Sequence, residues 1–223
     1  MKNDRFAQIN LIGNEMVACQ RACRDVYSDR AQGSPPRGLV RVSRDPDTQG
    51  AVLLGMNPGQ GDDRERAALQ ADPSYGATVR FMETERLPKH PYYKRVRSLI
   101  DSCELSGDLI WTELAKCQNA PGVNGSLPIE TNRTCSKAFL RREVEITPPT
   151  WGIFAIGRDA YRAATFMFLD RAILGVPHPT GSRGPWYAMF EDGILKPEVR
   201  QAVERILTSR RAAWIPEEVA TGL

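Results

Sequence analysis

The sequence lacks the features that would place it outside the ordinary globular proteins. Its 223 residues contain no internal repeat, no low-complexity tract and no apolar run near the roughly 18–20 residues of a membrane span. No apolar segment typical of a secretory signal follows its first residues. We therefore expect a cytoplasmic protein with no membrane partner, whose five cysteines do not form a disulfide framework.

A strong excess of one charge is also absent. The 30 Lys and Arg residues against 27 Asp and Glu residues give a net charge of +3, which does not by itself indicate a nucleic-acid partner. The basic residues are unevenly distributed, because residues 86–97 and 133–142 carry basic side chains and no acid. Such runs are typical of a solvated surface and also of a DNA-binding face.

Short apolar runs bounded by Gly and Pro predict the strands of a sheet, over residues 51–56, 108–114, 151–156 and 173–176. Apolar positions at helical spacing predict helices over residues 95–103, 133–146, 158–170 and 197–208. This alternation favours an α/β fold, a three-layer sandwich with a central, mainly parallel four-stranded sheet flanked by helices. We expect one domain over residues 1–223, with a surface loop at 31–49 and a loose tail at 213–223.

A turn rich in glycine follows the first predicted strand. It reads Gly55-Met56-Asn57-Pro58-Gly59-Gln60-Gly61-Asp62 and lies at a strand end, where α/β sheets bind their ligands. Glycine lets the main chain approach a ligand closely, and its N–H groups can hold an anion. The spacing matches neither a Walker loop nor a dinucleotide-binding motif. The alternative is a plain strand-to-helix turn in which Asn57 and Asp62 serve as caps.

A second unusual loop contains one of the two histidines. It reads His178-Pro179-Thr180-Gly181-Ser182-Arg183-Gly184, and its small residues leave the main chain accessible. Arg183 suits a phosphate group. The alternative is a histidine that makes a structural hydrogen bond.

The cysteines form two local groups and one remainder. We expect Cys19 and Cys23, four residues apart, to lie on adjacent helical turns. We expect Cys117 to follow the second strand and Cys135 to begin a helix. Four thiolates from these segments would suit zinc or an iron–sulfur cluster. Ordinary buried cysteines are the alternative. Cys103 is left outside this set.

Taken in their order along the chain, these motifs resemble those of the uracil-DNA glycosylase superfamily. The segment 55–59 resembles its first motif, in the asparagine form of the mismatch-specific and thymine glycosylases, and 178–182 resembles its second, histidine-containing motif. Lys116-Cys117, Cys135 and the segment 156–160 resemble its iron–sulfur branch. That resemblance implies a [4Fe–4S] cluster, with zinc as the alternative, held by Cys19, Cys23, Cys117 and Cys135. The resemblance to the family covers about residues 15–208.

The resemblance also implies an activity and the residues that perform it. The protein would be a monomeric DNA glycosylase that flips out a deaminated or damaged base, uracil or a related base, and excises it by hydrolysis. Asn57 would position the water, His178 would stabilise the leaving base, and Asp62 would act as a base or only cap a helix. The residues that would bind the flipped base are Gly55, Met56, Pro58, Gly59, Tyr92, Glu113 and Asn119. Among them, the ring of Tyr92 would stack on the base. The residues that would contact DNA are Arg95, Arg97, Ser182 and Arg183.

The chain departs from the family pattern in three places. The first cysteine pair has three intervening residues where the branch has two, and the spacing from Cys117 to Cys135 is slightly longer. Glu113 stands where the family reads uracil with an asparagine. An ionised Glu only accepts hydrogen bonds, so we expect a base other than uracil that presents donors. The alternatives are a protonated Glu113, a contact from Asn119 or Asn124, or a strand-end carboxylate paired with an arginine.

Two other classes of function remain open from the sequence. One is a protein of the same fold that binds nucleic acid, or one lesion covalently, without turnover. The other is an unrelated α/β hydrolase with a zinc site, although neither G-x-S-x-G nor H-E-x-x-H occurs in the chain.

Overall fold

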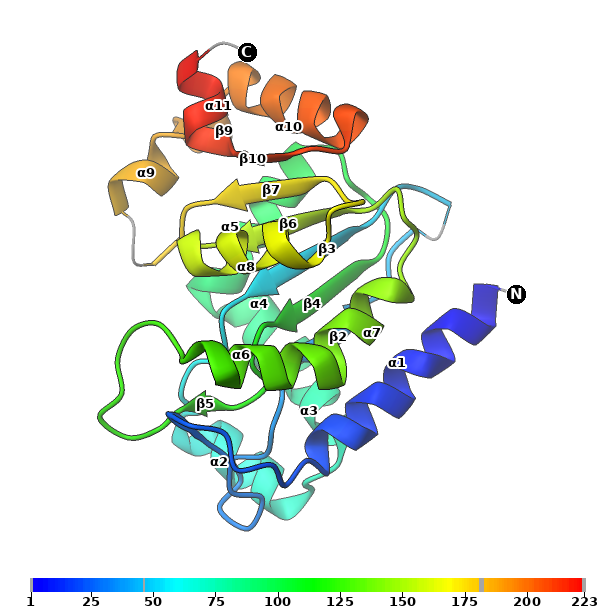
Figure 1. The fold of residues 1–223 in the computed structure, drawn as a ribbon, viewed down its shortest axis with the longest axis vertical. Helices are drawn as coiled ribbons and strands as arrows, with labels where there is room; N and C mark the ends of the chain where they lie inside the picture. Colours follow the sequence, from blue (N-terminus) through cyan, green and yellow to red (C-terminus); the bar gives the residue numbers. More distant parts are fainter. Residues whose placement is uncertain (1, 46, 181–182, 222–223) are drawn as a thin grey trace. The chain divides into compact units, whose positions relative to one another are not determined.

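The structure, a computed structural model, describes residues 2–45, 47–180 and 183–221 (Figure 1). Contacts divide the chain into two compact units. The first unit comprises residues 1–41, 55–86 and 111–147, and the second comprises 42–54, 87–110 and 148–223. The single domain expected for residues 1–223 stays a prediction. Each unit is described below by itself.

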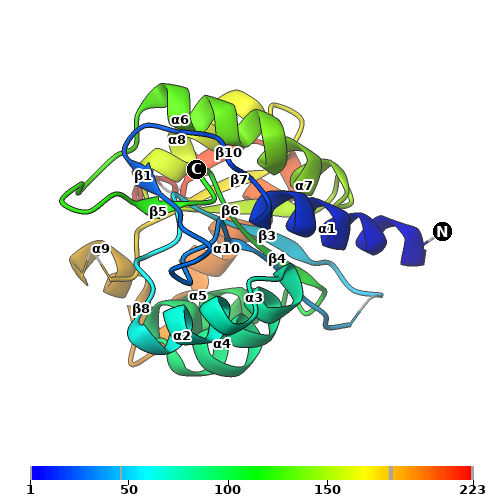
Figure 2. The same cartoon turned by 90° about the horizontal axis from the view of Figure 1, so that it is seen from below.

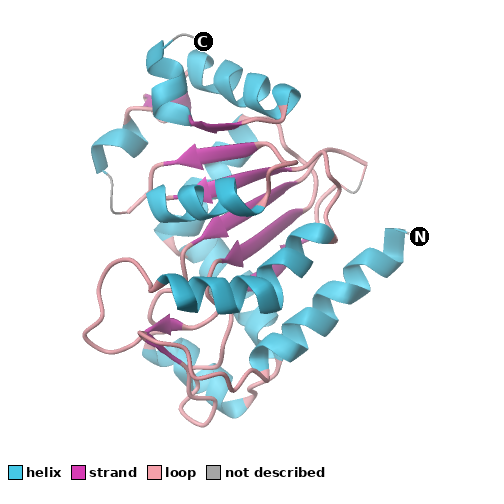
Figure 3. Cartoon of the chain, in the orientation of Figure 1, coloured by secondary structure: helices cyan, strands magenta, loops and turns pink. Residues whose placement is uncertain are grey.

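The central feature of the fold is a six-stranded sheet with the order β10-β7-β6-β3-β4-β2 (Figure 3). Its strands are β2 (Leu39–Val42), β3 (Ala51–Gly55), β4 (Leu109–Glu113), β6 (Gly152–Ile156), β7 (Ile173–Val176) and β10 (Ala212–Trp214). The pairs β3–β6, β6–β7 and β7–β10 are parallel. Every residue of β3, β6 and β7 is buried, which explains their continuous apolar sequences. The α/β class with a mainly parallel sheet flanked by helices is therefore confirmed.

The four predicted strands are present as β3, β4, β6 and β7, and the sheet has two further strands at its edges, β2 and β10. β2 lies inside the segment 31–49 expected as a loop, and β10 extends from Ala212 into the segment 213–223 expected as a loose tail. β2 has only two buried residues, and β10 consists of Ala-Ala-Trp, which has little intrinsic preference for a strand. The segment becomes a strand because it pairs with β7, where Ala213 lies opposite Leu174. The sequence of the segment does not show this pairing. The helix α11 (Ile215–Thr221) follows.

The first unit contains four of the five cysteines, Cys19, Cys23, Cys117 and Cys135. α1 (Lys2–Val17) packs on α3 (Tyr75–Phe81) and on α7 (Arg141–Glu145). α6 (Ile129–Cys135) continues through a π-helical turn, η2 (Ser136–Leu140), into α7, so the helix predicted over 133–146 is confirmed. The unit also contains α2 (Asp63–Ala71), a second π-helical turn, η1 (Met82–Arg86), and the antiparallel pair β1 (Val26–Tyr27) and β5 (Gln118–Asn119).

In the second unit, α8 (Arg158–Met167) covers one face of β6 and β7, and α5 (Pro91–Ser102) lies on the opposite face (Figures 1 and 2). α10 (Pro197–Ser209) packs on β7 through a buried apolar stripe. Shorter elements complete the unit: α4 (Leu87–Lys89), α9 (Arg183–Tyr187), β8 (Phe190–Glu191) and β9 (Ile194–Leu195). Among the described residues, no helix has both the length and the apolar character needed to cross a membrane.

Candidate functional site

The first unit holds Asn57 in one orientation. Its Nδ2 donates to the main-chain carbonyl of Cys117 (3.3 Å) and to Oδ1 of Asn119 (2.8 Å). A carbonyl can only accept, so the atom that faces Cys117 must be the amide nitrogen. Oδ1 of Asn57 makes no hydrogen bond to any residue that the structure describes. The turn thus presents a fixed acceptor that can orient a water molecule.

The turn that carries Asn57 is anchored by residues that the sequence did not single out. Arg37 donates to the carbonyl of Gly59 (2.7 Å) and to Oε1 of Gln118 (3.1 Å), and the Gly61 N–H donates to the same oxygen (3.3 Å). Arg37 also forms a buried ion pair with Glu65 (2.7 Å). No local motif signals Arg37, Gln118 or Glu65, since each acts through partners distant in sequence.

The start of the turn lies against the end of β4. The carbonyls of Gly55 and Met56 accept hydrogen bonds from the N–H groups of Leu114 and Ala115, both 3.0 Å long. Pro58 lies 3.2 Å from the position that a Cβ on Gly38 would take, whereas a Cβ on Gly59 would meet nothing within 4 Å. The predicted base-binding residues at 55–59 therefore include one, Gly59, with open space beside its main chain.

Asp62 caps the helix α2. Its side chain accepts from the N–H of Glu65 (2.9 Å) and pairs with Arg86 (3.2 Å). The hydrogen bond from Glu65, followed by the charge of Arg86, lowers the pKa of Asp62. A carboxylate whose pKa is lowered is a weaker base. The capping alternative is confirmed, and a catalytic role for Asp62 stays a prediction.

Glu113, at the end of β4, packs against the first residue of the turn. Its Oε2 is enclosed and has no hydrogen-bond partner among the described residues, although part of the residue remains exposed. Burial raises the pKa of Glu113 to about 8. The predicted alternative of an ion pair with an arginine does not occur among the described residues.

A buried ion pair lies beside Glu113 in the first unit. Nζ of Lys116 contacts Oε2 of Glu143 (2.7 Å), Oγ1 of Thr112 (2.6 Å) and the main-chain carbonyl of Glu113 (2.8 Å). The side chains of Lys116 and Glu143 are 1% and 0% exposed, so solvent does not screen them. The resemblance drew attention to Lys116 only as the neighbour of Cys117, and its contacts with Glu143 and Thr112 were not predicted.

Two of the four cysteines of the first unit lie in a different local structure from the one expected. Cys19 and Cys23 follow the end of α1 in an irregular segment, so the prediction that they lie on adjacent helical turns is wrong. The pKa of Cys117 is raised to about 12, mainly by burial and in smaller part by the thiols of Cys135, Cys19 and Cys23. The N–H of Lys116 donates to Sγ of Cys135 (3.2 Å), and Cys135 directly precedes the π-helical turn η2, a feature frequent at functional sites. Cys103 lies in the second unit, where burial raises its pKa to about 12 and its charged neighbours are Arg200, Glu204 and Glu104.

The chemistry of these thiols would suit a soft metal. A set of sulfur donors without a carboxylate selects zinc or an iron–sulfur cluster over magnesium or calcium. In the described part of the chain, no three His, Cys, Asp or Glu side chains already form a metal site. The donor chemistry therefore fits the implied cluster or the zinc alternative, and the choice between them stays a prediction.

The second unit brings together Tyr92 and His178. Their ring centroids lie 5.2 Å apart with a tilt of 34°, and Tyr92 also meets Tyr93 edge to face at 5.0 Å. His90 caps α5 by accepting from the N–H of Tyr92 (3.3 Å), which places that ring at the first turn of the helix. Two residues predicted to act on one base are thus neighbours in space.

The hydrogen bonds of His178 fix its tautomer. The main-chain N–H of Thr180 donates to Nδ1 (3.3 Å), so in the neutral ring the proton is on Nε2. Burial lowers the pKa of His178 below its ordinary value of 6.5. The ring is therefore neutral at pH 7, with Nε2–H as its donor.

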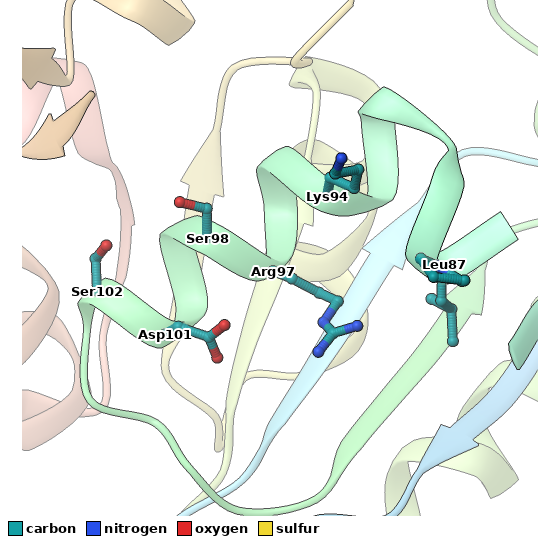
Figure 4. A pocket seen from close by; sticks show the side chains of 7 residues that line it. Leu87, Lys94, Arg97, Ser98, Asp101 and Ser102 are labelled. Carbon is teal, nitrogen blue, oxygen red and sulfur yellow. The ribbon is translucent and has the colours of Figure 1, made fainter. Parts of the chain in front are cut away.

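The predicted DNA-contacting residues have different surroundings. Arg95 donates to the carbonyl of Pro179 (2.9 Å) and lies over the ring of Tyr187 (5.5 Å), so it holds the histidine loop. Arg97 lines an open groove of about 670 Å³ along α5 (Figure 4). Leu87, Pro88, Lys94, Ser98, Asp101 and Ser102 complete its lining. Ser182 and the side chain of Arg183 lie outside the described residues.

The search for relatives does not name a family. No protein-family model matches the chain, and no curated protein matches it significantly. What the molecule does must therefore be argued from its motifs and geometry. Within the first unit these place Asn57, Asn119 and Cys117 together, and within the second they place Tyr92, His178 and Arg95 together.

Proposed function

We propose that the protein is a DNA glycosylase, similar to the iron–sulfur branch of the uracil-DNA glycosylase superfamily, that hydrolyses the bond between a damaged base and its sugar. The observation that carries this proposal is the contact between Tyr92 and His178 in the second unit. An aromatic ring that can stack on a flipped base stands beside a neutral imidazole that can donate to the base. The two residues are distant in sequence.

The flipped base needs stabilisation outside the duplex. Unstacking and unpairing cost a few kcal/mol, and one aromatic stack returns about 1–3 kcal/mol. Tyr92 is half-buried at the start of α5, so its ring is held while part of the side chain remains exposed. This residue would offset much of the cost of extrusion.

The chemical step is the displacement of the base by water at C1′ of the sugar. As the water oxygen bonds to C1′, the bond from C1′ to the base nitrogen breaks and its electron pair leaves with the base. Asn57 would orient the water through Oδ1, because its amide nitrogen is held by Cys117 and Asn119. The amide is not a base, so the water keeps its proton until the sugar has become strongly positive. The proton then passes to the solvent or to the departing base.

His178 would stabilise the negative charge that develops on the leaving base. Its Nε2–H can donate to a base carbonyl, and the lowered pKa keeps the ring a neutral donor at pH 7. Arg95, which bonds to the carbonyl of Pro179, would keep the loop of His178 in place.

The cluster would be held by Cys19, Cys23, Cys117 and Cys135. When bound, it would cross-link the segment after α1, the segment after β4 and the helix α6. Cys117 would thus have two roles. Its thiol would bind the cluster, and its main-chain carbonyl accepts the hydrogen bond that orients Asn57. We assign the cluster no part in the chemical step.

A second candidate is a protein of the same fold that binds damaged DNA without releasing the base. The structure gives this candidate one specific support, because Asp62 is occupied as a helix cap and its pKa is lowered. A water held by Asn57 alone would have no strong base nearby in the turn. Binding would then still use Tyr92 and His178.

The test is a panel of oligonucleotides, single- and double-stranded, each with one uracil, hypoxanthine, xanthine or other lesion. The wild-type protein should produce alkali-labile sites on at least one substrate. His178→Ala should reduce the single-turnover rate about 10²- to 10³-fold, as expected for the loss of one donor to a developing anion. His90→Asn is the matched control, since asparagine keeps the cap of α5.

The outcomes separate the candidates. Lesion-dependent binding without base release on any substrate would support the second candidate and contradict the first. Cleavage that is equally fast in His178→Ala and His90→Asn would remove the assigned role of His178.

A further inference from the structure

The helix formed by α6, η2 and α7 repeats its burial every four residues. The three elements follow one another without a break in the chain (green in Figure 1). The residues at 135–136, 139–140 and 143–144 are buried, and those at 133, 137, 141 and 145 are exposed. One face of the helix is therefore buried, and the opposite face presents every fourth residue to the solvent.

The π-helical turn η2 explains this repeat of four. A regular α-helix has about 3.6 residues per turn, so positions four apart rotate around its axis by about 40° at each step. Two such steps separate residue 133 from residue 141. η2 lies between these two residues, and a π-helical turn contains more residues than an α-helical turn. The wider turn takes up the rotation, and Arg133, Lys137 and Arg141 stay on one exposed face.

These three side chains, which we call the basic row, have no acidic partner. None of them forms an ion pair or a side-chain hydrogen bond with a residue whose side chain the structure describes. Glu130 and Glu145, the exposed acids of this helix, lie at its two ends and outside the row. Other accessible arginines of the chain do have acidic partners: Arg142 pairs with Glu15, Arg158 with Glu217 and Arg200 with Glu104.

The basic row is unfavourable for the helix that carries it. Like charges four residues apart repel each other and destabilise a helix, and the row contains two such pairs in succession. Solubility does not require the row either, because a surface of mixed charges serves it equally well. A row of like charges without counter-charges attracts a partner of the opposite charge, which here is a polyanion.

The geometry favours a nucleic-acid strand over an anionic membrane. Four residues of a helix rise by roughly 6 Å, so the cations of the basic row follow one another at a regular spacing, as the phosphates of a strand do. A helix that binds a membrane surface needs an exposed apolar face beside its cations. Phe139, Leu140 and Val144 are buried, and of the large apolar side chains described on this helix only Ile129, at its first position, is exposed.

We propose that the basic row, formed by Arg133, Lys137 and Arg141, binds the phosphate backbone of a DNA strand without reading its sequence. The inference rests on the proposed function for the identity of the ligand, but it requires neither a lesion nor the release of a base. Among the exposed residues of this helix there is no aromatic ring on which a base could stack, so the contacts are made with phosphates. The basic row adds a contact face in the first unit to the DNA-contacting residues predicted in the second.

The test is the salt dependence of binding to undamaged oligonucleotides, single-stranded and duplex, measured by fluorescence anisotropy. The basic-row variant Arg133→Gln/Lys137→Gln/Arg141→Gln removes three charges and keeps residues that favour a helix. On the duplex, the plot of log affinity against log salt concentration should become less steep by about 2 to 3, which is close to one unit for each lost phosphate contact. At about 50 mM salt the affinity should fall tenfold or more.

The matched control removes the same charge from the second unit, in the variant Arg162→Gln/Lys196→Gln/Arg210→Gln. None of its three side chains forms an ion pair with a described residue. The control should change the steepness of the plot by less than about one unit. The urea midpoints of both variants should stay close to that of wild type, because the replaced side chains are exposed or half-buried. A loss of DNA binding is then not a loss of folding.

Three results would overturn the inference. The first is a basic-row variant that keeps the wild-type salt dependence. The second is an equal loss of salt dependence in the control, which would show that only net charge matters. The third is binding to vesicles of phosphatidylserine and phosphatidylcholine that depends on the basic row, together with DNA binding that does not.

The same experiment separates the inference from the proposed function. A wild type that binds undamaged DNA through the basic row but cleaves no lesion supports the inference and contradicts the proposed function. A wild type that cleaves a lesion, with a basic-row variant that binds DNA equally well, contradicts the inference and leaves the proposed function in place.

Discussion

The side-chain amide of Asn57 donates to the main-chain carbonyl of Cys117 at 3.3 Å. The residue proposed to orient water and a residue proposed to bind the cluster are therefore joined by one hydrogen bond. Asn119, which follows Cys117 closely in β5, accepts the other bond from the same amide, at 2.8 Å. The segment after β4 thus has two roles, since it holds a thiol and sets the direction of Asn57.

The first prediction concerns Asn119. Asn119→Ala removes one acceptor from the amide of Asn57, so Oδ1 loses part of its fixed orientation. Losing one such bond costs about 1–2 kcal/mol, and the single-turnover rate should fall roughly 5- to 30-fold. Asn119→Asp keeps an acceptor and should stay within about threefold of wild type. Equal rates in wild type and Asn119→Ala would show that this bond does not position Asn57.

The second prediction concerns the metal. Protein purified without oxygen should contain iron and acid-labile sulfide in equal amounts. Replacing Cys19, Cys23, Cys117 or Cys135 singly by serine should reduce the iron content strongly, because a hydroxyl is a poor ligand for this metal. Cys103→Ser is the matched control and should keep the full content. Zinc without sulfide in the wild type would establish the alternative metal, and equal loss in Cys103→Ser would contradict the assigned ligand set.

The fold could largely be predicted from the sequence because its inner strands are buried on both faces. The runs at 51–56, 151–156 and 173–176 are apolar throughout and end at glycine or proline, so their bounds differ from the structure by one residue or less. β10 could not be predicted, because Ala212 and Ala213 become a strand only through pairing with β7. A strand of this kind is formed by tertiary contacts and not by the preference of its own residues.

The candidate site could be predicted where its residues share a short motif, as in the turn 55–62. The anchoring of that turn by Arg37 and Gln118 could not, since it depends on partners distant in sequence. The state of Glu113 likewise depends on space left by Gly55 and on the pairing of Lys116 with Glu143. Protonation is a property of such surroundings and not of a residue type.

The third prediction concerns the buried pair of Lys116 and Glu143. Lys116→Met leaves the carboxylate of Glu143 buried beside Thr112 without its cation, which should cost about 3–5 kcal/mol of unfolding free energy. The double variant Lys116→Met/Glu143→Gln contains no buried charge there and still offers Thr112 an acceptor. It should be more stable than Lys116→Met alone in urea unfolding, with metal content measured in parallel. A double variant that is less stable than Lys116→Met would contradict this account.

The fourth prediction compares two glycines of one turn. Gly55→Ala would place a Cβ 2.1 Å from Oε2 of Glu113, so the acid must move. Overpacking of this kind should destabilise the protein by about 1–3 kcal/mol. Gly59→Ala meets nothing within 4 Å and should change the unfolding free energy by less than about 0.5 kcal/mol. If Gly59 approaches the nucleotide, as predicted, Gly59→Ala should slow cleavage while its urea midpoint stays unchanged.

The fifth prediction concerns stability against pH. The pKa of Glu113 is raised to about 8 by burial, from an ordinary value of 4.5 that applies in the unfolded chain. Between these values the folded protein binds a proton that the unfolded chain has lost. Stability from this group is therefore fully present below about pH 4.5 and is lost as the pH rises to about 8. The slope is at most about 1.4 kcal/mol per pH unit.

The measurement is urea unfolding of wild type and Glu113→Gln at several pH values in this window, because the difference between them cancels the other titrating groups. Glutamine has no proton to lose, so it should gain stability relative to wild type as the pH rises, and the gain should level off above about pH 8. A constant difference across the window would mean that Glu113 titrates alike in both states. A difference of opposite slope would mean that a cation holds Glu113 ionised in the folded protein.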